Sequence, residues 1–338
     1  MSKIIRKSLM LLLFAVVICC VVYPLVLLAI GQTFFPFQSN GSIVNGPDGK
    51  PVGSMLVAQP FTKDEYFQPR PSAAGYDGTA SASSALASSN YVLRDRVAHM
   101  LGPIAQYAAG PKAGQLVAPD IEVWFQNDVY QGSPHIVAQW ASMHPGDALA
   151  WVNTDSLHTA YVADWAKSHP DIVAQFIKNN PSISQPAPSN LAVAFFQNFS
   201  TDNPGKFVSA VTDTGADGKV ATVIKPVSTG TDIQSDFFDL WRLDHPNDSL
   251  QNVPGDMVTT SGSGLDPDIT MQNAIFQLKR VSAKWAADLK HSESDVRKQI
   301  VGILQKDSFA PIDGLAGEKM INVLQVNLEL RSLYGAPQ

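Results

Sequence analysis

Cysteine and charge are both scarce in this chain of 338 residues. The two cysteines, Cys19 and Cys20, stand side by side, which excludes a disulfide scaffold and a cysteine-based zinc site. Charged residues make up 16% of the sequence, against about 25% in a typical soluble domain. With 30 acidic and 24 basic residues the net charge is −6. No basic excess exists to neutralise a phosphate backbone, so we expect no nucleic-acid partner.

Catalytic motifs are absent as well. There is no P-loop, no Asp-Lys-Thr-Gly phosphorylation motif, no His-Glu-x-x-His and no Cys-x-x-Cys. The run Ser261-Gly-Ser-Gly264 does not fit the Gly-x-Ser-x-Gly elbow of hydrolases. His135 and His144 are nine residues apart, and His158 and His169 are eleven apart. These spacings lack a metal-ligand pattern, so we interpret the histidines as surface or capping residues. The sequence therefore predicts no catalytic residue, no metal site and no bound cofactor.

A long charge-free run lies near the N-terminus. Residues 9–30 contain no charged side chain, whereas Lys3, Arg6 and Lys7 precede them. A helix of this length spans a hydrocarbon core of about 30 Å. Because basic residues mark the cytoplasmic side, we predict a single-pass anchor at 1–31 in a bacterial cytoplasmic (inner) membrane. The N-terminus is then cytoplasmic and the rest of the chain is extracytoplasmic.

A cleaved signal peptide is the alternative for the same segment. Its basic start fits, and Ala29-Ile30-Gly31 resembles a small-x-small cleavage site. The apolar run is, however, longer than the roughly 7–15 residues of a signal peptide. A retained helix would pack against partner helices through small residues. The anchor residues of this prediction are Leu9, Ala15, Cys19, Pro24 and Ile30.

The remaining chain contains several helix patterns and a few short strand patterns, two of which form a hairpin, and we predict an α+β fold. Residues 54–58 and 257–259 are expected to be strands, and residues 321–330 lean towards strand. The segments 208–212 and 220–224 predict a hairpin. Helices are expected after Asn90 and over 157–167, 171–178, 237–243, 273–287 and, after a capping box, from Ser292.

Two polar stretches, residues 59–76 and 256–267, fit neither helix nor strand. Both combine hydroxyl groups, a charge and a restricted backbone, which lets a loop bind with little ordering cost. Arg70 lies between prolines and needs an acceptor if it is partly buried. Either Asp266 or the carbonyl groups of the turn at 261–264 would supply that acceptor, and the alternative for Asp266 is to cap the next helix. We therefore expect the two stretches to be neighbours in space and to form a partner-contact surface.

Several motifs in the same order are similar to one known family. They are Gly53-Ser-Met-Leu-Val-Ala-Gln-Pro-Phe61, Tyr66-Phe-Gln-Pro-Arg-Pro-Ser-Ala73, Ser88-Ser-Asn90, Asp256-Met-Val-Thr-Thr-Ser-Gly-Ser-Gly-Leu-Asp-Pro267 and Ile321-Asn-Val-Leu-Gln-Val-Asn-Leu328. This set resembles the C subunit of the Kdp-type potassium-transporting P-type ATPase over residues 1–101 and 253–334. Asp268 stands where that family usually has a histidine.

The resemblance implies a fold and a set of contact residues. One N-terminal transmembrane helix would precede an extracytoplasmic mixed α/β domain, formed by 32–101 and 253–338, with an inserted lobe at 102–252. The partner-contact residues that it implies, together with the polar stretches, are Gln59, Phe61, Tyr66, Phe67, Arg70, Pro71, Ser72, Tyr76, Ser89, Asn90, Ser261, Gly262, Ser263, Gly264, Leu265, Asp266, Pro267, Asn322 and Asn327.

The resemblance also implies a function. The chain would be a non-catalytic accessory subunit that assembles or stabilises a channel-like potassium-binding subunit and a P-type ATPase catalytic subunit in the lipid membrane. It would act as a catalytic chaperone that raises ATP affinity, while the partner subunits handle ATP and potassium. Because only about eight residues precede the span, we expect this effect to be indirect. A membrane-anchored solute-binding or hydrolase domain is the alternative.

Overall fold

The computed structural model describes residues 2–46, 49–128, 135–214, 220–315 and 317–337. The chain forms two compact units. We call Met1–Ala85 with Pro254–Gln338 the split unit and Leu86–Val253 the middle unit. Each has a hydrophobic core of its own. In the described residues the strands form three antiparallel two-stranded sheets among many helices, so the α+β prediction is confirmed.

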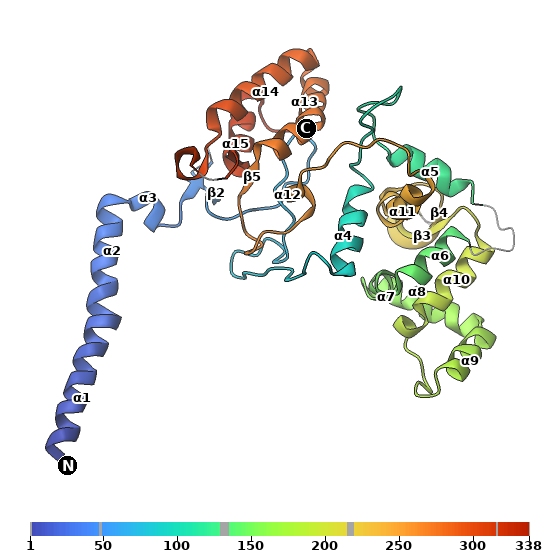
Figure 1. Cartoon of the computed structure of the whole chain (residues 1–338), viewed down its shortest axis with the longest axis horizontal. Helices are drawn as coiled ribbons and strands as arrows, with labels where there is room; N and C mark the ends of the chain where they lie inside the picture. The colour runs from blue at the N-terminus through green and yellow to red at the C-terminus, as the bar shows by residue number, and fades with distance from the viewer. Residues whose placement is uncertain (1, 47–48, 129–134, 215–219, 316, 338) are drawn as a thin grey trace. The chain divides into compact units, whose positions relative to one another are not determined.

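The chain begins with one continuous helical rod (Figure 1). Its parts are α1 (Ser2–Val17), the π-helix η1 (Ile18–Val22) and α2 (Tyr23–Phe34). Pro24 lacks an N–H group, and just before it the Tyr23 N–H bonds to the Ile18 carbonyl, five residues back. The stretch Lys3–Phe34 is long and apolar enough to cross a membrane, as predicted for residues 9–30.

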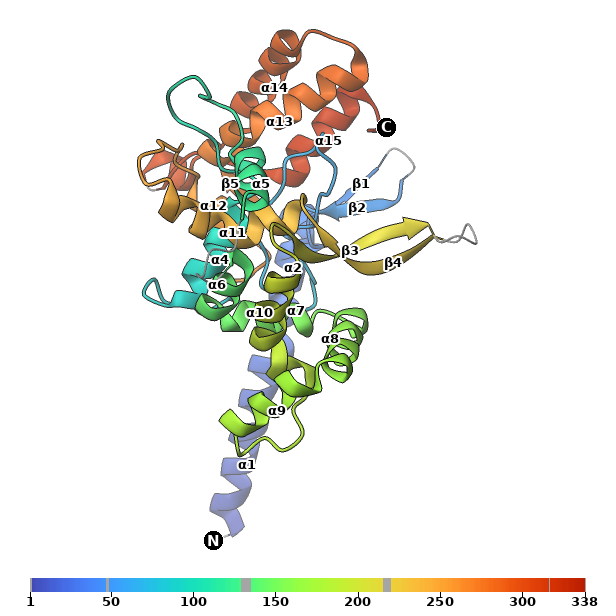
Figure 2. The same ribbon diagram turned by 90° about the vertical axis from the view of Figure 1, so that its right-hand side faces the viewer.

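The split unit is built around three helices at the C-terminal end, α13, α14 and α15, which lie side by side (Figures 1 and 2). Their apolar faces enclose Phe67 and Ile321, which are fully buried. The elements are α3 (Pro36–Ser39), β1 (Ile43–Asn45), β2 (Pro51–Ser54), α12 (Gly255–Val258), β5 (Asp268–Thr270), α13 (Met271–Leu289), α14 (Glu293–Asp307), η3 (Pro311–Gly314), β6 (Met320–Asn322) and α15 (Val323–Tyr334).

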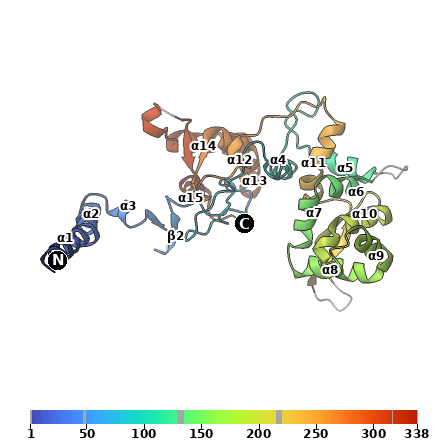
Figure 3. The same ribbon diagram turned by 60° about the horizontal axis from the view of Figure 1, so that its bottom comes forward.

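The middle unit is a helical domain with one long hairpin, β3 paired with β4 (Figure 2). Helices α7 to α10 gather at one end of this unit (Figure 3). Trp140 is almost completely buried and contacts Phe196, Phe207 and Phe237. The elements are α4 (Tyr91–Leu101), α5 (Ala118–Gln126), α6 (Ile136–Met143), α7 (Pro145–Val152), α8 (Ser156–Ser168), α9 (Pro170–Asn179), η2 (Pro188–Leu191), α10 (Ala192–Asp202), β3 (Phe207–Thr214), β4 (Val220–Val227) and α11 (Thr231–Asp244).

The structure confirms the expected helices and the hairpin but corrects four local predictions. Residues 321–330 are mostly helix, because the chain leaves β6 after Asn322, whose side chain caps α15. Residues 257–259 begin inside the short helix α12 rather than a strand. The strand expected at 54–58 ends at Ser54. Ser292 precedes α14 without a side-chain capping bond.

The histidines are the other correction. His135, His144 and His169 occupy helix-end positions, but none of them makes a side-chain capping bond to the helix that it precedes. The surface interpretation is wrong for three of them, because His135, His144 and His158 are buried. Each of these three lies beside an aspartate. A carboxylate supplies the hydrogen bond that a buried imidazole requires.

Candidate functional site

The two polar stretches are direct neighbours within the split unit. The Ala58 N–H donates to the Leu265 carbonyl at 2.9 Å, and the Ala82 N–H donates to the Ser263 carbonyl at 3.0 Å. These backbone bonds hold the glycine-rich turn, residues 261–264, against the chain that flanks the first stretch. The predicted neighbourhood of residues 59–76 and 256–267 is therefore confirmed, although the middle unit separates them in sequence.

Arg70 and Asp266 join the two stretches through their side chains. Arg70 Nη1 lies 3.3 Å from Asp266 Oδ2, and Nη2 donates to the Thr260 carbonyl at 3.2 Å. Asp266 Oδ1 accepts from the Asp268 N–H at 3.1 Å. Helix α13 is capped by Thr270, whose hydroxyl accepts from the Asn273 N–H. Of the two alternatives for Asp266, the structure thus shows the arginine partner and not the helix cap.

Ser72 holds the glycine-rich turn from the other side. Its hydroxyl donates to the Gly264 carbonyl and accepts from the backbone N–H groups of Ala74 and Tyr76. The Tyr76 hydroxyl donates to the Arg70 carbonyl at 2.9 Å. The Ser72 hydroxyl thus uses its one donor and both acceptor positions. These bonds fix the loop at 72–76 and attach it to the glycine-rich turn.

The segment 64–68 is gripped by side chains rather than by a strand. Asn327 accepts from the Phe67 N–H at 2.9 Å and donates to the Phe67 carbonyl at 2.8 Å. Gln277 does the same for Gln68, at 2.8 and 3.0 Å. Each amide side chain makes the two hydrogen bonds that the backbone of a neighbouring strand would otherwise make. Asn327 comes from α15 and Gln277 from α13, so two helices clamp one extended segment.

Two more residues of α13 complete this clamp. Arg280 donates to the carbonyls of Asp64 and Tyr66, and the Trp285 indole N–H donates to the Glu65 carbonyl at 2.8 Å. Asn327 is among the contact residues predicted from the sequence, whereas the three clamp residues of α13 are not. A buried polar side chain on this helix was the feature that could have indicated them. Gln277 directly precedes Leu278 in the sequence, and both side chains are buried.

Asn322 is a junction between three parts of the split unit. Its Oδ1 accepts from the Gln325 N–H, and its Nδ2 donates to the Met55 carbonyl and to Asp268 Oδ1, each at 3.0 Å. Burial, and secondarily the charge of Asp266, raises the pKa of Asp268 to about 6, while the bond from Asn322 opposes that rise. A carboxyl group that titrates at mildly acidic pH therefore lies beside the turn.

The predicted contact residues differ greatly in exposure. The side chains of Phe67, Ser261, Asn322 and Asn327 are buried in the split unit, as is the backbone turn at Gly264. Exposed members are Gly262 in the turn and, in the middle unit, Ser89 and Asn90, of which Asn90 caps α4. The partly exposed members are Gln59, Phe61, Tyr66, Arg70, Pro71, Ser72, Tyr76, Ser263, Leu265, Asp266 and Pro267.

This surface is rich in hydroxyl groups and backbone amides, with Arg70 and Asp266 as its paired charges. Neither stretch contains a histidine or a cysteine. The predicted anchor residues Leu9, Ala15, Cys19, Pro24 and Ile30 are all exposed along the apolar rod. The fold and the site together define a class: a domain with a rigid polar surface attached to a single candidate membrane-spanning helix.

Comparison with known proteins gives the family within this class. The sequence model of the family "K+-transporting ATPase, c chain" matches residues 5–121 and 231–332, which is more than half of the chain. The chain therefore belongs to the K+-transporting ATPase c chain family.

Individual relatives match over a shorter region. The chain is 43% identical over 111 residues to the potassium-transporting ATPase KdpC subunit of Pseudomonas syringae pv. tomato, covering 33% of this chain and 58% of that relative. For the subunit of the same name from Myxococcus xanthus the identity is 44% over 100 residues, covering 28% and 47%. The alignments thus span about half the length of these relatives.

The family-matched ranges extend beyond the motifs described above. They include α4, the first turn of α5 and α11 of the middle unit, whereas the segment 122–230 between them contributes the rest of α5, α6 to α10 and the hairpin. At the edges of this segment, the Gly230 N–H donates to Glu122 Oε1 at 2.8 Å. The segment therefore leaves and rejoins the family-matched part at neighbouring points. The boundaries predicted for an inserted lobe, 102–252, stay a prediction.

Proposed function

We propose that this chain is an accessory subunit of an ATP-driven potassium uptake pump, in which it assembles or stabilises a channel-like potassium-binding subunit and a P-type ATPase catalytic subunit. The observation that carries the proposal is the family match over both halves of the split unit. The apolar rod and the rigid polar surface supply the two kinds of contact that such a subunit needs, one in the membrane and one outside it.

The proposed orientation follows from charge. Lys3, Arg6 and Lys7 precede the rod, and basic residues stay on the cytoplasmic side of a bacterial inner membrane. The two compact units are then extracytoplasmic. Without these three residues, 21 basic and 30 acidic residues remain, and this net charge of −9 suits a soluble exported domain.

We further propose that the chain acts as a catalytic chaperone, raising the ATP affinity of the catalytic subunit without touching ATP. In the proposed orientation only the first few residues are on the side where ATP is present. Any effect on ATP affinity must then pass through the rod or through assembly of the complex. Purified pump with and without this chain should differ in its KM for ATP, and an equal KM would contradict the chaperone part alone.

The contact surface can be tested at Gly262, which is exposed and where an added Cβ atom would meet nothing within 4 Å. An arginine there fits the free chain but would collide with a partner seated on the turn. We expect Gly262→Arg to lower recovery of the two partner subunits with the tagged chain by about tenfold, since about 1.4 kcal/mol of lost binding is a factor of ten.

A matched control is Gly302→Arg, because Gly302 on α14 is also exposed and equally open. Its recovery of partners should equal that of the unchanged chain, and neither variant should have a lower melting temperature than the unchanged chain, since arginine favours a helix more than glycine does. If Gly262→Arg recovers partners normally, the turn is not the contact surface. If the unchanged chain is recovered without partners under potassium starvation, the accessory function itself is wrong.

A further inference from the structure

The middle unit contains a cluster of carboxylates and imidazoles that the proposed pump function does not use. Four aspartates and two histidines line a narrow pocket between α4, the α6–α7 junction and α11. Among the described residues that line it there is no lysine or arginine. Even with both histidines protonated, four carboxylates leave two negative charges without a counter-charge, so a cation is favoured there. The lining acids and histidines are Asp95, His99, His144, Asp147, Asp236 and Asp239.

His144 is placed as a metal ligand would be. Its side chain is 8% exposed, and its Nε2 lies 2.9 Å from Asp239 Oδ2. A carboxylate on one ring nitrogen directs the proton to that nitrogen and leaves the other as a lone-pair donor. The other nitrogen, Nδ1, is buried and has no hydrogen-bond partner. An unsatisfied buried nitrogen of this kind requires an explanation, and a bound cation supplies one.

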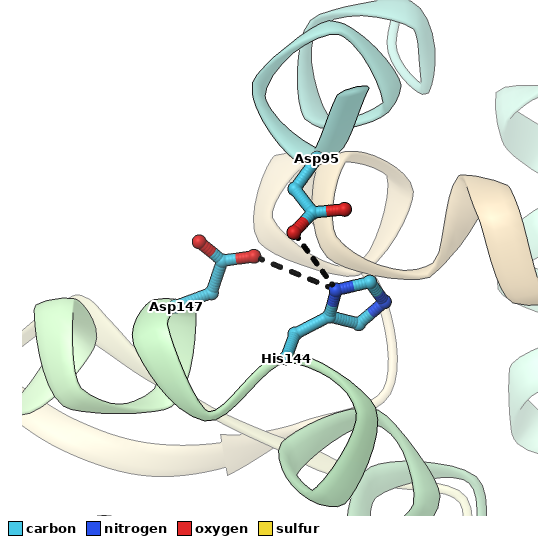
Figure 4. A group of neighbouring side chains, drawn as sticks. All are labelled: Asp95, His144 and Asp147. Carbon is cyan, nitrogen blue, oxygen red and sulfur yellow. Dashed lines mark ion pairs between the residues drawn. The ribbon is translucent and has the colours of Figure 1, made fainter. Parts of the chain in front are cut away.

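Two carboxylates converge on this nitrogen, as Figure 4 shows. Asp95 from α4 has its Oδ2 3.4 Å from His144 Nδ1, and Asp147 from the first turn of α7 has its Oδ2 4.0 Å away. The three candidate ligand atoms lie within 4.8 Å of one another. Ligands that bind one tetrahedral Zn²⁺ at about 2.1 Å lie about 3.4 Å apart. The Asp95–His144 distance already fits, whereas the exposed Asp147 side chain would move closer by about 0.6 Å.

We propose that Asp95, His144 and Asp147 bind one Zn²⁺ ion. Imidazole nitrogen with carboxylate oxygen is a donor set that zinc accepts, whereas Mg²⁺ and Ca²⁺ prefer oxygen ligands throughout. The Asp147 side chain is 52% exposed, so the fourth position opens towards solvent and water can fill it. Asp239 is a positioning residue, which orients the imidazole from the far side.

The proposed site includes residues inside and outside the family-matched ranges. His144 and Asp147 lie in the segment 122–230, between the two matched ranges, and Asp95 and Asp239 lie within them. The site therefore ties the intervening segment to the family-matched helices α4 and α11. A zinc ion there would stabilise the middle unit, because ligand binding to the folded state alone adds to the free energy of unfolding.

The test is zinc titration by calorimetry of the full-length chain in detergent, purified without a histidine tag and stripped with a chelator. We expect one Zn²⁺ per chain and a raised melting temperature. The ligand variants Asp95→Asn and Asp147→Asn should each lower the affinity by about tenfold or more, and Asp239→Asn by about 10- to 100-fold. Excess Mg²⁺ or Ca²⁺ should not displace the zinc.

A matched control is available in the same unit. Asp155 pairs with the buried His158 and is 51% exposed, almost the same as Asp147, but it forms a pair with no second carboxylate. Asp155→Asn keeps an N-cap on α8 and should bind zinc as the unchanged chain does. Cobalt in place of zinc should give a visible absorption band that Asp147→Asn removes and Asp155→Asn keeps.

Three results would overturn the proposal. One is the absence of stoichiometric zinc binding, in which case His144 serves only as an ion-pair partner of Asp95 and Asp239. Another is equal affinity in Asp147→Asn and the unchanged chain. The third is an equal loss in Asp147→Asn and Asp155→Asn, which would indicate general binding to surface acids. Circular dichroism checks that each variant is folded, and Asp95→Asn provides an independent test if Asp147→Asn is not.

Discussion

At the scale of single residues, the polar surface depends on backbone geometry at Gly264. Its φ of +69° lies in the left-handed region, and a Cβ atom there would be 2.7 Å from the Ala82 carbonyl oxygen and 2.9 Å from the Ala74 nitrogen. Both the conformation and the close approach of the backbone exclude a larger residue. The close approach of the two stretches at this turn therefore requires glycine at position 264.

We expect Gly264→Ala to lower the free energy of unfolding by about 1–3 kcal/mol, because the new methyl group is both strained and in collision. Gly262, two residues earlier, has an open surrounding and an ordinary φ. Gly262→Ala is the control and should leave the denaturation midpoint unchanged within about 0.5 kcal/mol. Equal effects of the two substitutions would contradict this account of the turn.

The carboxyl group of Asp268 should make stability depend on pH. Its folded-state pKa is about 6, whereas the unfolded value is about 3.9. Between these values the folded chain holds a proton that the unfolded chain has lost, so the free energy of unfolding falls as pH rises through this window. Above about pH 6 the free energy of unfolding stays at this lower value, as far as Asp268 is concerned.

Asp268→Asn should remove that slope and make the chain more stable near neutral pH. The amide oxygen can still accept from Asn322 Nδ2, which lies 3.0 Å from Asp268 Oδ1. Urea denaturation of both proteins across the window measures the effect. A slope that persists unchanged in Asp268→Asn would mean that another group causes it.

At the scale of elements, helices α13 and α15 hold the segment 64–68 by side-chain amides. Phe67 brings its ring into the core between these helices, so its backbone groups are also taken out of water. Asn327 satisfies both of them. The clamp therefore lets an irregular segment be buried without joining a sheet.

Replacing Asn327 by leucine, of similar size, should leave the Phe67 N–H and carbonyl buried without partners. We expect a loss of about 2 kcal/mol or more, since each unsatisfied group costs about 1–3 kcal/mol. Gln325→Leu on the exposed side of the same helix should cost far less. Chemical denaturation compares the two, and an Asn327→Leu protein as stable as the unchanged chain would show that the clamp adds nothing to stability.

At the scale of the whole molecule, the split unit has its own core, and none of the described residues in 86–253 belongs to it. Its two chain segments approach each other where the Ala82 N–H meets the Ser263 carbonyl and the hydroxyls of Ser84 and Thr260 lie 3.2 Å apart. A unit inserted in the sequence can be removed when the remaining unit has its own core and the two chain ends left by the deletion lie close together.

We therefore expect a chain that lacks 86–253, with a short Gly/Ser linker joining Ala85 to Pro254, to unfold in one cooperative transition. The full chain is the control, and loss of a cooperative transition in the shortened chain would show that the split unit needs the middle unit. The shortened chain should also bind no zinc, since Asp95, His144 and Asp147 are gone. Its recovery with the partner subunits measures whether the middle unit takes part in assembly.

The sequence by itself determined the features that depend on local order. The apolar run at residues 9–30 predicts a helix because no charge interrupts it, and the cap at Asn90 and the hairpin strands depend on neighbouring residues. The pairing of Arg70 with Asp266 was also predictable, because a partly buried guanidinium needs an acceptor and the motifs offered few.

Apart from the Arg70–Asp266 pair, only the tertiary structure decided which distant residues share a contact. The helix at 323–334 replaced the expected strand because Asn322 caps it, and the clamp residue Gln277 meets Gln68 across 209 residues. The histidine spacing gave no metal pattern, since Asp95 reaches His144 from another helix. The spacing of residues in the sequence indicates which side chains share a face of one helix or strand. Burial and charge at these sites depend instead on helices from distant segments that pack together.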